Sequence, residues 1–272
     1  MWISSLALEF IAVFTALLIV AYLVPAGVFH WLIEVRRAPG LTENKIQERR
    51  ARPKDVRREI GHSLTSLLLF TLFSMGLIRA YDAGLAAVYW NVRDYPLLWL
   101  PGSFIAAMVL HDTYFYWTHR LMHTRLLYPW FHSGHHKSVT PTPWAMLAFQ
   151  PLETVPQFAF FALLILLVPM HPAVLLAYLV FDGFVNAAGH CGHEIVPRPY
   201  QRHWLLKYVN AVSHHDLHHS RFRYNFGQYF NVWDRLMGTF LDRAARDETT
   251  RDEKTGASPH AFGEPMPSDR AP

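Results

Sequence analysis

The chain has 272 residues, of which 51% are hydrophobic and 17% are charged, against about 25% charged in an ordinary soluble domain. This balance favours a protein with much of its surface in lipid. The densest basic stretch behind the net charge of +4 lies at 36–58, between two apolar segments, where membrane topology explains it better than nucleic-acid binding. A single cysteine, Cys191, excludes a disulfide framework and a thiolate-bound metal cluster.

Five apolar segments are candidate membrane helices, judged against the roughly 20 residues that a helix needs to cross a bilayer. They lie at about 3–33, 63–81, 96–117, 152–168 and 172–185. The last two are joined by a turn from Pro169 to Pro172 that cannot continue a helix, so the pair is expected to form a helical hairpin. The sequence therefore predicts an all-α fold, a polytopic transmembrane helical bundle of about four to five membrane helices.

The distribution of basic residues predicts the orientation of this bundle. The loop at 34–59 carries nine Lys and Arg residues, so the positive-inside rule places it in the cytoplasm. Counting spans from this loop brings every histidine cluster to the same cytoplasmic face. The polar but aromatic segment 197–241 is expected to form a histidine-rich helical cap there, and the tail 244–272 is expected to be disordered.

Histidine is the most unusual feature of the sequence, because 14 of the 17 histidines lie between His111 and His219. Four short segments contain the spacings that place imidazoles on one helix face, namely HxxxH, HxxHH, NxxxH and HxxHH. Together they offer nine imidazoles and one amide oxygen, enough for two metal ions with about five ligands each. The predicted ligands are His119, His123, His132, His135, His136, Asn186, His190, His215, His218 and His219.

Other residues near these segments are candidates for additional ligands or for groups that orient the ligands through hydrogen bonds. The alternative for the acidic ones is an ordinary ion pair with a nearby arginine. The candidates are His111, Asp112, His193, Glu194, His214 and Asp216. The sequence does not identify residues that bind a substrate.

The choice of metal follows from the ligand set and the chemistry together. Structural zinc prefers closed four-ligand sites, often with cysteine, and a haem needs only one or two axial ligands, so neither accounts for ten neutral ligands. Imidazole suits iron, copper, zinc and nickel alike. Two iron ions can share the reduction of O2, which a zinc ion cannot carry out. An oxidative function would therefore favour iron, while the spacing of the histidines is merely compatible with it.

The histidine segments resemble those of the fatty acid hydroxylase superfamily, which includes sterol desaturases, sterol methyl oxidases and sphingolipid hydroxylases. The opening Tyr116-Trp-Thr-His-Arg-Leu-Met-His123 is similar to the family's first motif. Two longer stretches, 132–157 and 214–238, resemble the sterol C-5 desaturase (lathosterol oxidase) branch. Residue by residue, the family's metal ligands would fall on the nine histidines named above, and Asn186 matches a position that holds an amide or imidazole ligand in related membrane desaturases.

The resemblance implies a membrane-bound di-iron oxidoreductase that uses O2 and external electrons to desaturate or hydroxylate a lipid, such as a sterol or related isoprenoid. No bound haem or flavin is expected, because the His-Pro-Gly-Gly haem motif of some relatives is missing from the sequence. Electrons would come from a separate protein, cytochrome b5-like or ferredoxin-like with its reductase. A non-catalytic histidine-rich membrane protein for metal binding or transport is the alternative, and a membrane haem protein of electron transfer is a further one.

The sequence also suggests a division of the chain and a location. Residues 1–95 would form N-terminal membrane helices and the basic cytoplasmic loop, 96–243 a fatty acid hydroxylase-like catalytic domain, and 244–272 the polar tail. No retrieval signal for the endoplasmic reticulum is recognisable in the last residues. On that ground the sequence favours a bacterial inner membrane over the endoplasmic reticulum.

Overall fold

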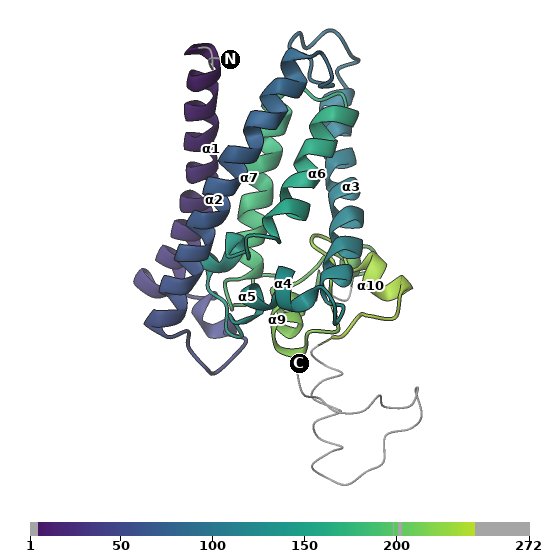
Figure 1. Ribbon diagram of the computed structural model, residues 1–272. Helices are drawn as coiled ribbons and strands as arrows, with labels where there is room; N and C mark the ends of the chain where they lie inside the picture. The colour runs from purple at the N-terminus through teal and green to yellow at the C-terminus, as the bar shows by residue number, and fades with distance from the viewer. Residues whose placement is uncertain (1–4, 198, 201–202, 243–272) are drawn as a thin grey trace, which may run out of the picture.

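The computed structural model describes residues 5–197, 199–200 and 203–242, and in this part of the chain the regular structure is helical, with no strand. Five long helices run side by side along one axis (Figure 1). They are α1 (Ser5–His30), α2 (Pro53–Asp82), α3 (Trp99–Met122), α6 (Thr154–Leu167) and α7 (Pro172–Gly189). The prediction of an all-α bundle is confirmed, while the tail at 244–272 lies outside the described residues.

Three of these helices are long and apolar enough to cross a membrane, where the sequence predicted four to five. The three segments are Ile11–Val35, Pro53–Asp82 and Pro172–Gly189. The helix α6 has 14 residues and a length of about 21 Å, which is short of a hydrocarbon core of about 30 Å. The second half of α3 contains His111 and Asp112, so its polar residues interrupt the apolar run.

Proline and polar side chains determine where these helices begin. Pro53 opens α2, and the preceding Arg52 binds Asp55 in the first turn with Nε 2.8 Å from Oδ2. The sequence predicted that this helix would begin at 63. The charged residues before that position are helical as well, so α2 begins at Pro53. Pro172 opens α7, and the Nδ1 of His171 accepts a hydrogen bond from the backbone N–H of Ala173. The predicted hairpin of α6 and α7 is therefore confirmed.

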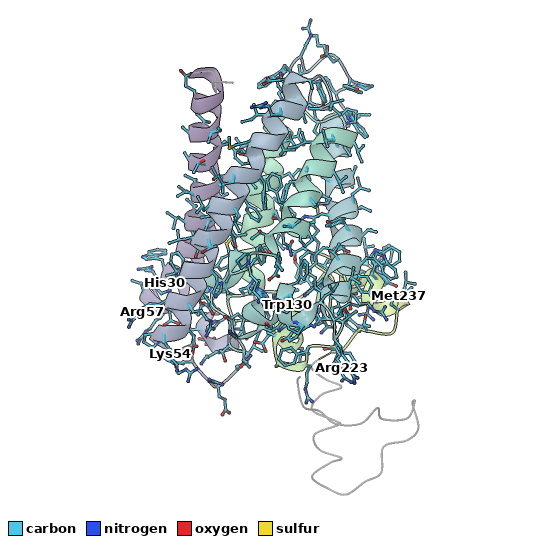
Figure 2. All side chains as sticks on the ribbon, in the orientation of Figure 1. His30, Lys54, Arg57, Trp130, Arg223 and Met237 are labelled. Carbon is cyan, nitrogen blue, oxygen red and sulfur yellow. The ribbon has the colours of Figure 1, made fainter. Side chains whose placement is uncertain are left out.

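Short helices gather at one end of the bundle, the lower end in Figure 1. They are α4 (Tyr128–Phe131), α5 (Ser133–His136), α9 (Val212–Arg221) and α10 (Val232–Leu236), together with 3₁₀ turns at Pro143–Leu147 and Leu206–Tyr208. Figure 2 shows Lys54, Arg57 and Arg223 at this same end. The basic loop and the histidine-bearing helices thus share one end of the bundle, as the count of spans predicts. That this end faces the cytoplasm stays a prediction.

Two apolar cores hold the long helices together. One contains Tyr22 from α1, Phe70 from α2 and Met146 from the 3₁₀ turn, while the other joins Phe160 of α6 to Tyr178 of α7. A Cβ added at Gly183 would lie 2.8 Å from the backbone oxygen of Ala21, so the close approach of α7 to α1 requires glycine there.

The 3₁₀ turn is fixed between the first two helices by hydrogen bonds to one carbonyl group. Tyr22 donates its hydroxyl to the backbone oxygen of Trp144 at 3.1 Å, and Ser63 donates to the same oxygen at 3.0 Å. These bonds attach the segment after α5 to α1 and α2. The first two helices thereby support the end of the bundle at which the short helices gather.

Candidate metal centre

Nine histidines converge at the lower end of the bundle in two adjacent groups. Within each group all the candidate ligand nitrogens lie within 4.8 Å of one another, and the rings are buried or nearly so. The first group, called the five-histidine group below, consists of His119, His123, His132, His136 and His218. The second, called the four-histidine group, consists of His135, His190, His215 and His219.

Both HxxHH segments contribute to both groups. In α5 and its N-cap, His132 and His136 belong to the five-histidine group, while His135 belongs to the other. In α9, His218 belongs to the five-histidine group, while His215 and His219, four residues apart, share the other. Adjacent residues on a helix point about 100° apart, so a doubled histidine serves two neighbouring sites. The two groups are therefore connected through the same two helices.

The Nε2 atoms of each group face one another at short distances. In the five-histidine group, Nε2 of His136 lies 3.1 Å from that of His123 and 3.0 Å from that of His218. In the four-histidine group, Nε2 of His215 lies 3.0 Å from that of His190 and 3.1 Å from that of His219. Two ligands at right angles, each about 2.1 Å from a metal ion, stand about 3.0 Å apart. The spacing therefore fits metal coordination.

Hydrogen bonds at the opposite ring nitrogen determine the tautomer. The Nδ1 atoms of His119, His190 and His218 lie 2.9, 2.7 and 2.7 Å from backbone carbonyl oxygens. A carbonyl oxygen can only accept, so these Nδ1 atoms carry the proton and the Nε2 atoms present lone pairs. Lone pairs that face one another repel unless a cation lies between them. The donor set therefore fits a metal ion in each group.

Burial keeps the imidazoles in the form that binds metal. Burial, and then the neighbouring imidazoles, hold the pKa of His132, His135 and His218 well below the ordinary value. The rings are therefore neutral near pH 7, and a ligating imidazole must be neutral.

Glu153 is a residue of this site that the sequence analysis missed. Its side chain is fully buried, and Oε1 lies 2.5 Å from Nδ1 of His132. Burial raises the pKa of this carboxyl well above the ordinary value, and the hydrogen bond from the backbone N–H of Gln150 opposes that rise. A carboxylate that orients a ligating imidazole is a common feature of metal sites. The available signal was an acidic residue directly before an apolar helix, where an unpaired charge is costly.

The loop at 224–227 supplies two of the carbonyl partners. Phe226 accepts from His119, and Tyr224 accepts from His218. Asp234 fixes this loop by accepting the backbone N–H of Phe226 at 2.9 Å and that of Gly227 at 2.8 Å. A Cβ at Gly227 would lie 2.2 Å from the backbone oxygen of Phe230, so the turn requires glycine.

Asn186, a predicted ligand, lies one turn before His190 on α7. Its amide nitrogen donates to the backbone oxygen of Asp182 at 3.0 Å and to Oδ1 of the same residue at 3.1 Å. These bonds fix the orientation of the amide and leave its side-chain oxygen as the atom with ligand character.

The other candidates lie outside both groups. Oδ1 of Asp112 accepts the backbone N–H groups of Gln228, Tyr229 and Phe230 at 2.7–3.1 Å, so it fastens the segment before α10 to α3. The Nδ1 of His111 lies 2.7 Å from the hydroxyl of Tyr178 and 2.9 Å from that of Tyr229.

The remaining four candidates hold the loops around α9. His193 bonds within its own turn, to the backbone oxygen of Cys191. Glu194 accepts from the backbone N–H of Ser213, and His214 accepts from that of Ala211. Oδ1 of Asp216 accepts from Nε2 of Gln47 at 2.6 Å, which fastens the basic loop to α9.

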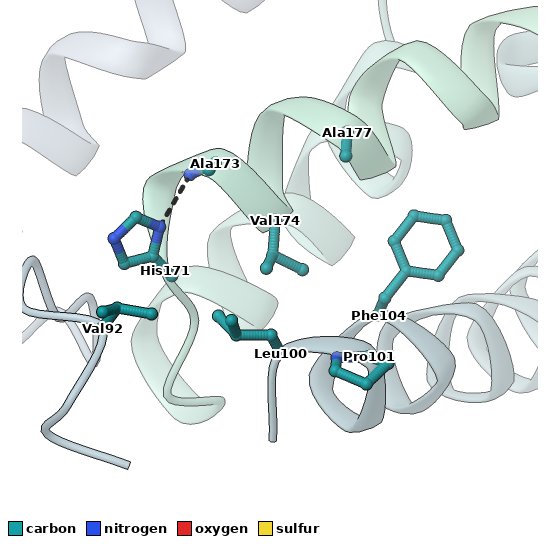
Figure 3. A pocket seen from close by; sticks show the side chains of 8 residues that line it. All are labelled: Val92, Leu100, Pro101, Phe104, His171, Ala173, Val174 and Ala177. Atoms are coloured by element: carbon teal, nitrogen blue, oxygen red, sulfur yellow. Dashed lines mark hydrogen bonds between the residues drawn. The ribbon is translucent and has the colours of Figure 1, made fainter. Parts of the chain in front are cut away.

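An apolar cavity of about 640 Å³ opens inside the membrane part of the bundle, between α1, α2, α6 and α7. Its lower end is formed by Met146, Asp182 and Gly183, and Asp182 lies one helical turn before Asn186 and two before His190. A second hollow of about 440 Å³ lies between the first turns of α3 and α7 (Figure 3), at the end of the bundle away from the two histidine groups.

Sequence comparison finds relatives among sterol-modifying enzymes. The chain is 30% identical over 221 residues to a Delta(7)-sterol 5(6)-desaturase of Gibberella zeae, which covers 80% of this chain and 64% of the relative. It is 32% identical over 187 residues to the lathosterol oxidase of Homo sapiens, covering 68% of this chain and 61% of the relative. The chain thus spans somewhat under two thirds of the length of these curated relatives.

The relatives correct the predicted location. They include fungal and mammalian sterol desaturases, which point to the endoplasmic reticulum, so the prediction of a bacterial inner membrane is wrong. The prediction used the lack of a recognisable retrieval signal, but such signals are addresses read by receptors and not a physical requirement of the fold.

The match to a family covers the part of the chain that carries the histidines. The fatty acid hydroxylase family model matches residues 104–239, which contain every member of both histidine groups. No solved structure matches the chain significantly. The convergence of the histidine segments, the family match and the relatives agree, and the chain belongs to the fatty acid hydroxylase family.

Proposed function

We propose that this chain is a membrane-bound di-iron oxidoreductase that uses O2 and external electrons to desaturate or hydroxylate a lipid of the sterol class. The observation that carries the proposal is the pair of adjacent histidine groups, each with Nε2 atoms facing inward at ligand-to-ligand distances. The names of the relatives, Delta(7)-sterol 5(6)-desaturase and lathosterol oxidase, support the substrate class.

The nine histidines would hold the two ions, five rings in one group and four in the other, with the side-chain oxygen of Asn186 as a further ligand. When bound, the iron pair would supply the reduction of O2 and the oxidation of an unactivated C–H bond. Desaturation takes two hydrogens from the lipid and, with two electrons and two protons from a donor, reduces O2 to two molecules of water. Hydroxylation uses the same electrons but leaves one oxygen atom on carbon.

The residues around the histidines would fix the rings in place. Glu153 and the carbonyls of Phe226, Tyr224 and Asn186 hold the Nδ1 protons, which directs Nε2 of each ring inward. Preorganised ligands cost little reorganisation when the ion changes its charge.

The cavity and the cap would control which C–H bond is oxidised. The cavity lies within the bundle and ends at Asp182 and Gly183, about two helical turns before His190, so a lipid that enters from the bilayer would point one end towards the four-histidine group. A volume of about 640 Å³ is in the range of ordinary small-molecule sites, about 300–1,000 Å³. The short helices bury the histidine rings, which keeps bulk water from the reacting atoms.

The division of the chain and its electron supply belong to the same proposal. Residues 96–243 would form the catalytic domain, in agreement with the family match at 104–239. Electrons would come from a separate protein, cytochrome b5-like or ferredoxin-like with its reductase, which docks at the basic end of the bundle.

The test is the iron and zinc content per chain, measured by elemental mass spectrometry on protein purified without oxygen in mild detergent. The double variant His135→Ala/His218→Ala removes one ring from each group. The control His203→Ala removes an exposed histidine outside both groups.

About two irons in the parent and the control, with a marked loss in the double variant, would support the proposal. Sterols supplied with O2 and reductant should then yield products changed in mass by loss of two hydrogens or gain of one oxygen. Metal-loaded protein that leaves every sterol unchanged would favour the non-catalytic alternative, and protein without metal would remove the basis of the proposal.

A further inference from the structure

A buried carboxylate lies at the lower end of the apolar cavity. Asp182 is 9% exposed and lines the cavity beside Met146 and Gly183. The other carboxylate in the wall, Asp82, is exposed at the opposite end. An ionisable group inside a membrane bundle is costly and generally marks a functional site. The position of Asp182 therefore requires a reason beyond packing.

The surroundings of Asp182 hold its carboxyl group through hydrogen bonds. Among the described residues its one ion-pair contact is with the buried His111, at 3.7 Å from Nδ1 to Oδ1. Oδ1 accepts from the hydroxyl of Tyr229 at 2.6 Å and from the amide of Asn186 at 3.1 Å, and Gln228 offers a further side-chain donor. A carboxylate has about four acceptor positions, so at least one is left for a ligand.

Neighbouring hydroxyl groups fix the direction of this acceptor. The hydroxyl of Tyr178, which also lines the cavity, lies 2.9 Å from that of Tyr229 and 2.7 Å from Nδ1 of His111. Because Tyr229 is bonded to both Tyr178 and Asp182, the carboxylate cannot rotate freely. A fixed acceptor at the end of an otherwise apolar chamber selects a ligand that is apolar along its length and carries a donor at one end.

The dimensions suit a rigid lipid of this kind. The wall formed by α7 extends from Pro172 to Gly183, a rise of about 16 Å. A sterol is an elongated apolar molecule with a single hydroxyl group on its first ring. With that hydroxyl at Asp182, the rings lie along α7 just above this residue, and the tail points up the cavity towards Pro172.

We infer that Asp182 is the acceptor for the free hydroxyl group of a sterol-class substrate and thereby determines which end of the lipid lies at the lower end of the cavity. The inference rests on the proposed function and deepens it. Carbons 5 and 6, which the relatives' name Delta(7)-sterol 5(6)-desaturase specifies, belong to the ring next to the one that bears the hydroxyl. A 3-keto analogue has the same shape and polarity, but it cannot donate a hydrogen bond to a carboxylate.

The test is a binding measurement that needs no turnover. A tritiated Delta(7)-sterol is displaced from purified, metal-free protein in detergent by the unlabelled 3-hydroxy sterol or by its 3-keto analogue. The parent should bind the alcohol about tenfold more tightly or better, because a hydrogen bond to a charged group is at stake. Asp182→Asn presents an amide, which can donate to a ketone, so its preference for the alcohol should vanish or reverse.

Two further variants control this measurement. Glu59→Gln makes the same chemical change at another fully buried carboxylate that lies outside the cavity lining and both histidine groups, and it should keep the ratio of the parent. Leu179→Trp narrows the cavity and should weaken the binding of alcohol and ketone alike. If Asp182→Asn fails to fold, as judged by its melting temperature, the ratio in the parent and the effect of Leu179→Trp decide the question.

Equal binding of alcohol and ketone by the parent, an unchanged ratio in Asp182→Asn, or full binding by Leu179→Trp would overturn the inference. Its failure can be distinguished from failure of the proposed function. A protein with two irons that oxidises sterols without preferring the free alcohol contradicts only the role of Asp182. A protein that prefers the alcohol but holds no metal contradicts only the di-iron proposal.

Discussion

The two histidine groups differ in how firmly their rings are held. In the five-histidine group, Nδ1 of His119, His132 and His218 each has an acceptor. In the four-histidine group His190 has such a partner, while Nδ1 of His135 and His219 is buried without a close hydrogen bond, as is Nδ1 of His136 in the five-histidine group. The first group therefore resembles a closed, fixed site and the second a site with fewer ligands and more freedom. One member of the less constrained group, His190, directly follows α7, which borders the cavity.

The largest expected effect comes from removing one ring from each group separately. His215→Ala would leave three imidazoles in the four-histidine group, whereas His218→Ala would leave four in the other. We expect His215→Ala to weaken metal binding in the four-histidine group by at least about 100-fold, because losing a ligand costs more than losing the hydrogen-bond partner of a ligand. His218→Ala should have a smaller effect on its own group. Chelator competition followed by iron analysis measures both. Equal losses in the two variants would contradict the distinction between the groups.

The next effect concerns Glu153. Replacing it with Gln keeps the shape of the side chain but removes the acidic group that is bonded to Nδ1 of His132, so metal affinity in the five-histidine group should fall by about 10–100-fold. Chelator competition is again the measurement. Glu59→Gln, a buried carboxylate whose Oε2 accepts from Thr142, is the matched control. If both variants release metal alike, Glu153 has no special part in orienting the ring.

Acid should destabilise the metal-free protein. The pKa of His132, His135 and His218 is lowered in the folded state, so the unfolded chain binds more protons once the pH falls toward about 6.5. Their contribution to stability is therefore complete above about pH 7 and is lost as the pH falls further, by up to about 1.4 kcal/mol per pH unit for each ring. Melting temperatures between pH 7.5 and 5.5 should fall. A constant or rising melting temperature would show that the rings titrate normally.

The smallest expected effect belongs to Cys191, which directly follows His190. The cysteine is buried, its Sγ donates to the backbone oxygen of His193, and it belongs to neither histidine group. Cys191→Ala should lower the unfolding free energy by only about 1 kcal/mol and leave the iron content unchanged. The melting temperature and the iron content check the two parts. A loss of iron in this variant would indicate that the thiol of Cys191 is a further ligand in the four-histidine group, and the two groups would then differ less.

Most of what could be predicted from the sequence follows from the spacing of residues within single helices. The histidine intervals predicted which rings would converge, because an i,i+4 pair lies on one helix face wherever the helix is placed. The basic loop and the number of apolar segments predicted that these rings would meet at one end of the bundle. Three of the five predicted spans are long and apolar enough to cross a membrane by length and composition, while α6 is shorter and α3 is more polar in its second half.

The division of nine histidines into groups of five and four depended on tertiary structure. Within a helix, His135 and His136 differ only by a rotation, and the positions of α3, α7 and α9 decide which group each joins. Glu153 could not be predicted for the same reason, because its contact with His132 depends on the fold of the segment between the two residues.

The sequence by itself determined which histidines converge, their location at the basic end of a helical bundle and the family of the chain. These properties follow from residue type and from periodicity along single helices. Tertiary structure alone decided the two groups, the outer partners of the rings and the cavity that ends at Asp182. Each of these features joins atoms from helices distant in sequence, and their separation is fixed by packing and not by any interval along the chain.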